Sequence, residues 1–233
     1  MNSKRCKRVG IIGGLGPETS CQFCLNLNRR FKQIFNKQPD ICLENLPISS
    51  HAEKILINGG TSSEHLALMM DAVERLNRNN ADMIAIPCNT VHIFIDKLKS
   101  ISNVPILNMI EECAEECHSK NIKKVGLLAS TKTLETNMYH KEMDQLGICT
   151  INPSQNEQNK ISEIILKIIN NSTTEEDVGF LKNVIIRMKE KGAEAVVLGC
   201  TDLPLLIKKI DSPLPLINSL EILEDAVIDV LSK

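Results

Sequence analysis

The segment AEAVVLGCTDLPLLI (193–207) is an apolar run that is broken by a glycine, a cysteine and a threonine before it resumes. An earlier segment, ADMIAIPCNTVHIFI (81–95), has nearly the same form, with Cys88 at the place of Cys200. Each short apolar run predicts a buried strand, and the residues after each cysteine predict the start of a helix. The chain therefore carries the same strand, the same cysteine and the same following turn twice.

Two further pairs of segments repeat in the same order along the chain. In every pair the second copy follows the first by 110 to 116 residues. Three ordered matches with nearly constant spacing indicate an internal duplication of one β/α unit. The two further pairs are KRVGIIGG (7–14) with KKVGLLAS (123–130), and VPILNMIEECAEE (104–116) with LPLINSLEILEDA (214–226).

Short β-rich runs alternate with longer helical patterns, such as the amphipathic stretch SSEHLALMMDAVERLNRN (62–79). This alternation predicts parallel sheets joined by right-handed crossovers. We therefore expect an α/β fold with two similar, doubly wound parallel-sheet domains and an active site in the cleft between them. The first domain should hold residues 1–104 and a strand and helix that return at 213–233, and the second should hold residues 105–212.

Composition narrows the classes of function. The chain has 233 residues, of which 42% are apolar, and a formal net charge of −2. A near-neutral chain with five Phe, one Tyr and no Trp has neither the basic face nor the stacking groups of a nucleic-acid binder. No apolar stretch approaches the roughly 18 residues of a membrane span. Nine cysteines without a secretion signal predict reduced thiols and a cytoplasmic protein.

Cys88 and Cys200 each end an apolar strand, where parallel sheets bind their ligands. A thiol at the start of a helix meets free backbone N–H groups and the positive end of the helix dipole. We therefore expect the pKa of both thiols to be lowered. Two opposed thiols suit a reaction that removes a proton from one face of a carbon and returns one to the other face. The duplicated cysteine thus predicts a catalytic pair in a racemase.

The other cysteines give weaker signals. Cys21 and Cys24 form a C-x-x-C that could serve redox or zinc chemistry, but the rest of a thioredoxin-like pattern is missing. Cys113 and Cys117 lie four apart beside His118, without further ligands at a useful spacing, so no metal site is expected. The remaining three are expected to be small buried apolar residues: Cys6, Cys42 and Cys149.

The segments GIIGGLGPETS (10–20), IPCNTVH (86–92) and LGCTDLPLLI (198–207), in this order, resemble the motifs of the aspartate/glutamate racemase family. These enzymes are cofactor-independent amino-acid racemases that use two cysteines. The resemblance covers essentially the whole chain. It implies two similar α/β domains with the active site between them, neither pyridoxal phosphate nor a metal, an amino acid as the small-molecule partner, and often a homodimer.

Through this resemblance Cys88 and Cys200 match the two acid/base cysteines. The other matching residues would bind the substrate, several of them through hydroxyl and backbone N–H groups that suit its α-carboxylate. The GGLGP loop (13–17) does not have the G-x-G-x-x-G spacing of a dinucleotide site. The predicted substrate-binding residues are Leu15, Gly16, His51, Asn89, Thr90, Ser130, Thr133 and Thr201.

Two departures from the family pattern concern the substrate side chain. His51 lies where the family commonly has an arginine for a side-chain carboxylate, and imidazole cannot form the bidentate guanidinium contact. Lys167 lies near, but out of register with, a family lysine for acidic substrates. His92, one helical turn past Cys88, is expected to be structural. Racemisation is therefore a firmer prediction than an acidic substrate.

Three alternatives stay open from the sequence. An enzyme similar to maleate isomerase or arylmalonate decarboxylase would use one cysteine and would not exchange the α-proton of amino acids. A non-catalytic amino-acid sensor would use the same cleft, although binding alone requires neither cysteine. A redox protein would use Cys21 and Cys24.

Overall fold

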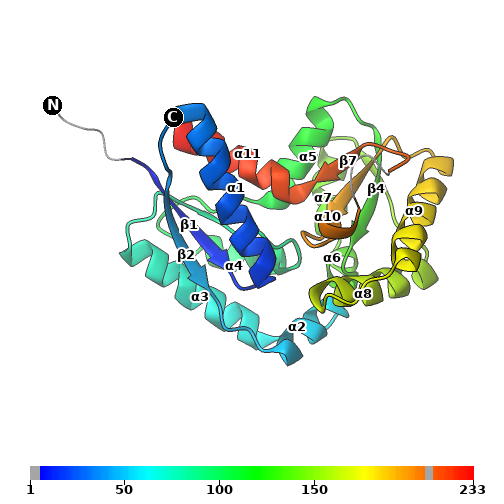
Figure 1. The fold of residues 1–233 in the computed structure, drawn as a ribbon, viewed down its shortest axis with the longest axis horizontal. Helices are drawn as coiled ribbons and strands as arrows, with labels where there is room; N and C mark the ends of the chain where they lie inside the picture. Colours follow the sequence, from blue (N-terminus) through cyan, green and yellow to red (C-terminus); the bar gives the residue numbers. More distant parts are fainter. Residues whose placement is uncertain (1–5, 208–211) are drawn as a thin grey trace.

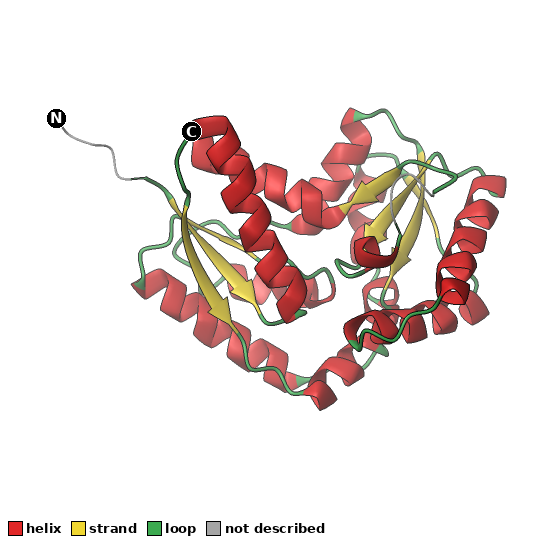
Figure 2. Ribbon diagram, in the orientation of Figure 1, coloured by secondary structure: helices red, strands yellow, loops and turns green. Residues whose placement is uncertain are grey.

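The computed structural model describes residues 6–207 and 212–233. Over these residues the chain forms two parallel sheets, each flanked by helices (Figures 1 and 2). The first sheet has the strand order β2-β1-β3, and the second has the order β5-β4-β6-β7. The strands are β1 (Arg8–Gly13), β2 (Asp40–Asn45), β3 (Met83–Ala85), β4 (Lys124–Ala129), β5 (Cys149–Ile151), β6 (Ala195–Gly199) and β7 (Leu216–Asn218).

The two sheets have the same internal order, as expected for a duplicated unit. An isolated parallel bridge between Ile84 and Ile106 adds residues beside β3, where β7 lies beside β6 in the second sheet. The hydrogen bonds also match: Ile84 N donates to Pro105 O and Val196 N donates to Pro215 O, both at 2.9 Å. The predicted α/β fold with two parallel-sheet domains is confirmed.

Helices follow the strands in the alternation that the sequence predicted. Several begin at side-chain caps, such as Ser130, which accepts a hydrogen bond from Thr133 N, and Ser154, which forms a capping box with Glu157. The helices are α1 (Pro17–Phe35), α2 (Ser50–Ile57), α3 (Ser63–Arg78), the 3₁₀ turn η1 (Thr90–Phe94), α4 (Ile95–Lys99), α5 (Met109–Ser119), α6 (Thr131–Glu135), α7 (Met138–Gln145), α8 (Gln155–Ile169), α9 (Glu175–Glu190), α10 (Leu203–Leu206) and α11 (Ser219–Ser232).

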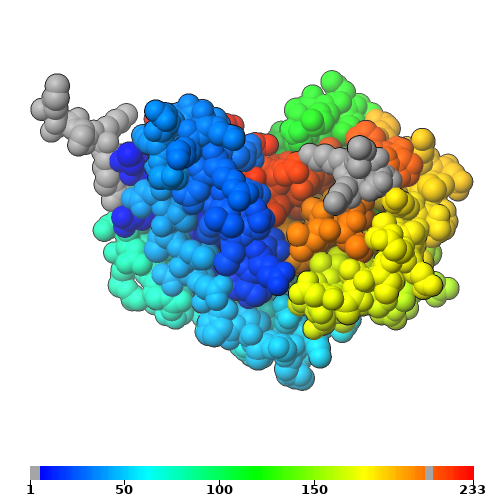
Figure 3. All heavy atoms as spheres, viewed as in Figure 1, coloured from blue at the N-terminus to red at the C-terminus, as the bar shows by residue number. Residues whose placement is uncertain are grey.

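Helices α5 and α11 each follow one sheet but pack on the other. Helix α5 comes after the residues beside β3, yet its Ile110 and Cys113 belong to the apolar core around β4. Helix α11 comes after β7, yet its Leu223 and Val227 pack in the core of β1 and α1. The two helices also pack against each other. They therefore tie together the two lobes seen in Figure 3.

This crossing corrects part of the predicted domain assignment. The strand within 213–233 was expected to complete the first domain, but β7 pairs with β6 of the second sheet. Only α11 returns to the first lobe. Likewise, residues 105–107 were assigned to the second domain, whereas their backbone hydrogen-bonds to β3. The reason is that each sheet is completed by its own fourth segment, and the chain changes lobes only after that segment.

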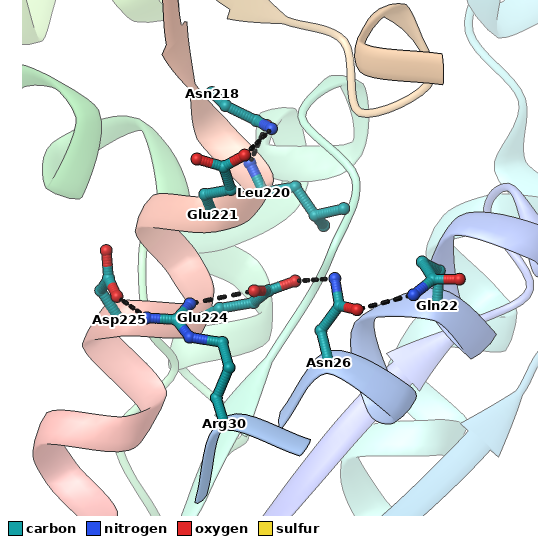
Figure 4. Close-up of polar contacts among 8 residues, drawn as sticks. All are labelled: Gln22, Asn26, Arg30, Asn218, Leu220, Glu221, Glu224 and Asp225. Atoms are coloured by element: carbon teal, nitrogen blue, oxygen red, sulfur yellow. Dashed lines mark hydrogen bonds and ion pairs between the residues drawn. The ribbon is translucent and has the colours of Figure 1, made fainter. Parts of the chain in front are cut away.

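A polar cluster attaches α11 to α1 (Figure 4). Arg30 forms an ion pair with Glu224 at 3.0 Å and a second one with Asp225, and Asn26 donates to the other Glu224 oxygen at 2.8 Å. Glu224 is only 2% exposed, and its burial raises the pKa of its carboxyl. A buried carboxylate needs such partners, so this cluster fixes how α11 lies on α1.

No helix among the described residues is long and apolar enough to cross a membrane.

Candidate active site

Cys88 and Cys200 occupy equivalent turns in the two lobes. Cys88 follows β3, and the backbone N–H groups of Thr90 and Val91 interact with its sulfur. Cys200 directly follows β6, and its sulfur interacts with the N–H groups of Asp202 and Leu203. In both cases the donors lie two and three residues after the cysteine. The duplicated sequence thus builds the same thiol-binding turn twice.

Both cysteines line one cleft between the lobes. The enclosed volume is about 40 Å³, and Leu15 and Gly16 reach it from the turn after β1. In that turn Gly14 has φ +82°, and a Cβ there would collide with the Leu46 backbone, so glycine permits the sharp bend. Eight of the ten predicted site residues line this cleft: Leu15, Gly16, Cys88, Asn89, Thr90, Ser130, Cys200 and Thr201.

The pKa values of the two thiols are raised, which contradicts the expected lowering. Burial raises the pKa of Cys88 to about 12 and that of Cys200 well above its usual value, and the nearby Asp202 carboxylate raises both further. The N–H groups at each turn oppose the shift, but desolvation of the thiolate is the larger effect. Both sulfurs therefore favour the protonated thiol.

Asp202 lies beside Cys200 and contacts the first lobe. Cys200 Sγ lies 3.8 Å from Asp202 Oδ2, and Thr19 Oγ1 of α1 donates a 2.6 Å hydrogen bond to Asp202 Oδ1. Burial raises the pKa of the Asp202 carboxyl, whereas the bonds from Thr19 and Cys200 lower it. Asp202 therefore joins the Cys200 turn to the first lobe.

Three hydroxyl groups meet across the cleft. Thr90 of the first lobe and Ser130 of the second lie 2.9 Å apart, and Thr133 Oγ1 is 3.0 Å from Ser130 Oγ and 3.2 Å from Thr90 Oγ1. Thr133 is fully buried behind the other two and does not line the cleft. Hydroxyl groups in this arrangement can donate hydrogen bonds to a carboxylate.

The Asn89 side chain is engaged elsewhere. Its Nδ2 donates to Ser219 Oγ at 2.9 Å, and its Oδ1 accepts a 2.6 Å hydrogen bond from Tyr139 Oη. Both partners are buried: Tyr139 lies in the second lobe, and Ser219, at the start of α11, donates to Leu198 O of β6. Asn89 therefore serves the cleft through its position in the Cys88 turn, while its amide joins the lobes.

His92 supports the Cys88 turn from behind. Its Nε2 accepts a hydrogen bond from Met109 N at 3.2 Å, so Nδ1 carries the proton and donates to Cys88 O at 2.8 Å. Burial lowers the pKa of His92 to about 4, so the ring is neutral. His92 is structural, as expected, and connects the Cys88 turn to the start of α5.

Neither His51 nor Lys167, the positions at or near which the family pattern has a cation for the substrate side chain, places a cation in the cleft. His51 is exposed on α2 and does not line the cleft, so the prediction that it contacts the substrate there is not supported by the geometry. The α2 helix turns position 51 outward because the buried residues of this helix are Ala52, Leu56 and Ile57. Lys167 forms an ion pair with Asp177 at 2.8 Å.

Several cleft residues were not predicted from the sequence. Glu53 lies half-buried on α2, three and four residues before the buried pair Leu56 and Ile57, and this helical spacing could have indicated it. His65 of α3 lines the cleft at 2% exposure. Asp202, two residues after Cys200, also lines the cleft. The rest of the wall is apolar: Ile48, Leu56, Ile57, Val91, Ile165 and Ile169.

The remaining cysteines have other surroundings. Cys21 is exposed and Cys24 half-buried on α1, where burial raises the pKa of Cys24 to about 11. Cys113 and Cys117 are buried in an apolar core, and Tyr139 Oη lies 3.7 Å from Cys113 Sγ. The expectation of burial was wrong for three cysteines, because two are exposed and one is half-buried: Cys6, Cys149 and Cys42.

Two duplicated parallel-sheet lobes that each contribute one cysteine to a shared cleft define a class of α/β proteins with a paired-thiol site. Residues 12–227 match the family model described as Asp/Glu/Hydantoin racemase, and the chain belongs to this family.

Individual relatives agree with this assignment. The broad specificity amino-acid racemase RacX of Bacillus subtilis is 22% identical over 91% of this chain and 92% of its own length. A glutamate racemase of Hydrogenobaculum sp. is 29% identical over 67% of the chain, which matches 60% of that enzyme's length. The solved aspartate racemase of Picrophilus torridus has a TM-score of 0.81 and 26% identity, covering 97% of this chain and 95% of that one.

Proposed function

We propose that this chain is a cofactor-independent amino-acid racemase in which Cys88 and Cys200 exchange the α-proton from opposite faces of the substrate. The observation that carries the proposal is the equivalent position of the two cysteines, which line one cleft from matching turns of the two lobes. The racemase names of the relatives and the family match support the same activity.

In the proposed reaction one sulfur acts as a thiolate and takes the α-proton, so the Cα–H bond breaks and an S–H bond forms. The electron pair left on Cα is delocalised into the substrate carboxylate. The opposite thiol then gives its proton to the other face of Cα and becomes the thiolate. The products are the opposite enantiomer and an enzyme with the same total number of protons. For the reverse reaction the two sulfurs exchange roles.

The hydroxyl groups of Thr90 and Ser130 are the proposed donors to the α-carboxylate, with Thr133 supporting them from behind. This arrangement would hold Cα between the two sulfurs and stabilise the charge that develops on the carboxylate. Burial raises the pKa of both thiols, and a substrate ammonium group held beside them would favour the thiolate. The two sulfurs titrate as a coupled pair.

The test is proton NMR of the α-hydrogen of L- and D-amino acids in deuterated water, with this protein and no added cofactor. We expect solvent exchange from both enantiomers of at least one amino acid, accompanied by inversion. Cys88→Ser and Cys200→Ser should each reduce inversion by at least about 10³-fold, as expected for the loss of an acid/base group. Cys21→Ser, at an exposed position, is the matched control. Ordinary racemisation by Cys88→Ser would rule out the two-cysteine mechanism.

A further inference from the structure

The cleft continues into a second cavity through shared walls. A volume of about 260 Å³ adjoins the cysteine cleft on the side of α2 and α8, and the two cavities have five wall residues in common. The region therefore offers room for a long substrate side chain beyond the reacting carbon. The shared residues are Gly16, Ile48, Glu53, Ile169 and Asp202.

The walls along this path are apolar and acidic. Ile48, Leu56 and Ile169 would contact methylene groups of a side chain, since each lines the cysteine cleft. The charged residues along the two cavities are Glu18, Glu53 and Asp202, all carboxylates. Among the described residues that line either cavity there is no lysine or arginine. The path thus has the character expected for an aliphatic chain that ends in a positive charge.

Glu53 is the carboxylate best placed for such a charge. It is half-buried at the junction of the two cavities, and no described residue donates a hydrogen bond to its side chain or forms an ion pair with it. Burial raises the pKa of Glu53 and the nearby Asp202 carboxylate raises it further, whereas the neighbouring Lys54 ammonium, which does not line either cavity, lowers it. Two neighbouring carboxylates in a partly dry cavity repel each other, and a cation between them would relieve the repulsion.

A second polar group in the cleft also lacks a partner. His65 is 2% exposed and lines the cleft, and its Nδ1 is buried without a hydrogen-bond partner among the described residues. Burial lowers the pKa of His65, so its ring is neutral and one ring nitrogen can accept a hydrogen bond. Ammonium and guanidinium groups carry several N–H donors, which makes them suitable partners for both Glu53 and a neutral imidazole.

We propose that the preferred substrates are amino acids whose aliphatic side chain ends in a cation, as in lysine, ornithine and arginine, with Glu53 as the specificity-determining residue. This inference rests on the proposed racemase function. The methylene groups would pack on the isoleucine and leucine walls, and the terminal cation would pair with Glu53. An aspartate or glutamate side chain would instead enter a path with three carboxylates and, among the described residues that line it, no lysine or arginine.

The experiment compares kcat/KM for α-proton exchange in deuterated water across lysine, ornithine, arginine, leucine, methionine, aspartate and glutamate. We expect the three basic amino acids to exceed the two acidic ones by at least about tenfold, the ratio expected for one charge pair in a cleft. Glu53→Gln should lower kcat/KM for the basic group by about tenfold and leave leucine and methionine unchanged. Glu53→Lys should improve aspartate and glutamate relative to lysine. Glu163→Gln, at an exposed position on α8, is the matched control.

The outcomes separate this inference from the function on which it rests. Exchange with aspartate or leucine but not with lysine would overturn the basic-substrate inference and leave the racemase proposal intact. An equal loss for all amino acids in Glu53→Gln would assign Glu53 a structural role and also overturn the inference. No exchange with any amino acid would instead contradict the proposed racemase function.

Discussion

Thr19 and Asp202 join the two lobes directly, because Thr19 Oγ1 in α1 donates a 2.6 Å hydrogen bond to Asp202 in the turn after β6. The same carboxylate lies 3.8 Å from the Cys200 sulfur. A residue of the first lobe thus influences the charge beside the thiol of the second. Both lobes therefore determine the electrostatics of the cleft as well as form its walls.

Removal of the Thr19 hydroxyl should disturb both the Cys200 turn and the contact between the lobes. Thr19→Val leaves Asp202 with one fewer donor, so the pKa of its carboxyl should rise further. We expect the free energy of unfolding to fall by about 1–2 kcal/mol. Turnover should fall by roughly tenfold, about 1.4 kcal/mol in the barrier, because the Cys200 turn loses the hydrogen bond that positions it against α1. Chemical denaturation and the exchange assay measure the two effects. Thr136→Val, at an exposed position, should change neither.

The pH dependence of turnover should follow the raised pKa values of the cysteine pair. Because burial raises the pKa of Cys88 to about 12, and that of Cys200 also rises, few enzyme molecules hold a thiolate at pH 7. Since the proposed mechanism requires one thiolate, kcat/KM should increase with pH from 7 to 10, by up to roughly tenfold per unit, and fall again once both sulfurs ionise. A profile that is flat across this range would contradict the requirement for a thiolate.

The hydroxyl cluster should affect substrate binding more than folding. Thr90→Val removes the first-lobe hydroxyl, which lies 2.9 Å from Ser130 Oγ, and leaves a side chain of similar shape. We expect KM to rise by about tenfold through the loss of one hydrogen bond to a charged carboxylate. Thr90→Ser keeps the hydroxyl and should restore most of the affinity. Equal kinetics for the valine and serine variants would exclude the hydroxyl from carboxylate binding.

Asp177 should stabilise the fold without contributing to the cleft. Its side chain accepts hydrogen bonds from Lys167 and Thr174 at the start of α9, and the Lys167 bond is the main cause of its lowered pKa. A lowered pKa stabilises the folded state above the unfolded pKa of about 3.9. This contribution is lost as the pH falls through the folded pKa.

Asp177→Asn should therefore lower the free energy of unfolding at pH 7 by about 1–2 kcal/mol. The difference from the natural protein should shrink below about pH 4. Denaturation curves at pH 7 and pH 3 measure both values, and the exchange rate at pH 7 should stay unchanged. A difference that is independent of pH would show that the Asp177 charge is not the stabilising feature.

The fold could be predicted because it depends on patterns that repeat within the chain. Alternating strands and helices fix the class, and the matching segments around Cys88 and Cys200 place both thiols at the carboxyl ends of strands. The exchange of α5 and α11 between the lobes could not be predicted, because β7 is equally apolar whichever sheet it joins. Its partner is decided by three-dimensional packing against β6.

Site residues that follow strand ends were predicted from the sequence. The cleft residue on α2 was missed, because the orientation of that helix decides which of its side chains face the cleft. Thr90, Ser130 and Thr201 follow strand ends, so their placement follows from the fold. Position 51 was assigned by alignment with the family, although the periodicity of α2 turns it to solvent and turns Glu53 toward the cleft. The pKa of the thiols could not be predicted either. The N–H groups that lower it lie within each cysteine turn, whereas the desolvation that raises it depends on how the two lobes pack around the sulfurs.

The exchange of α5 and α11 has an evolutionary consequence. A half-length ancestor with this pattern would end in a helix whose apolar face fits the sheet of another copy, with Asn108 and Asn218 now marking the two equivalent crossing points. Such a chain could bury that helix only by association with a second copy. A symmetric dimer would then have had two identical cysteines facing each other before gene fusion made them distinct. After fusion, the two walls of the cleft could diverge, so that Glu53 now lies on the wall from the first lobe and Ile165 and Ile169 lie on the wall from the second.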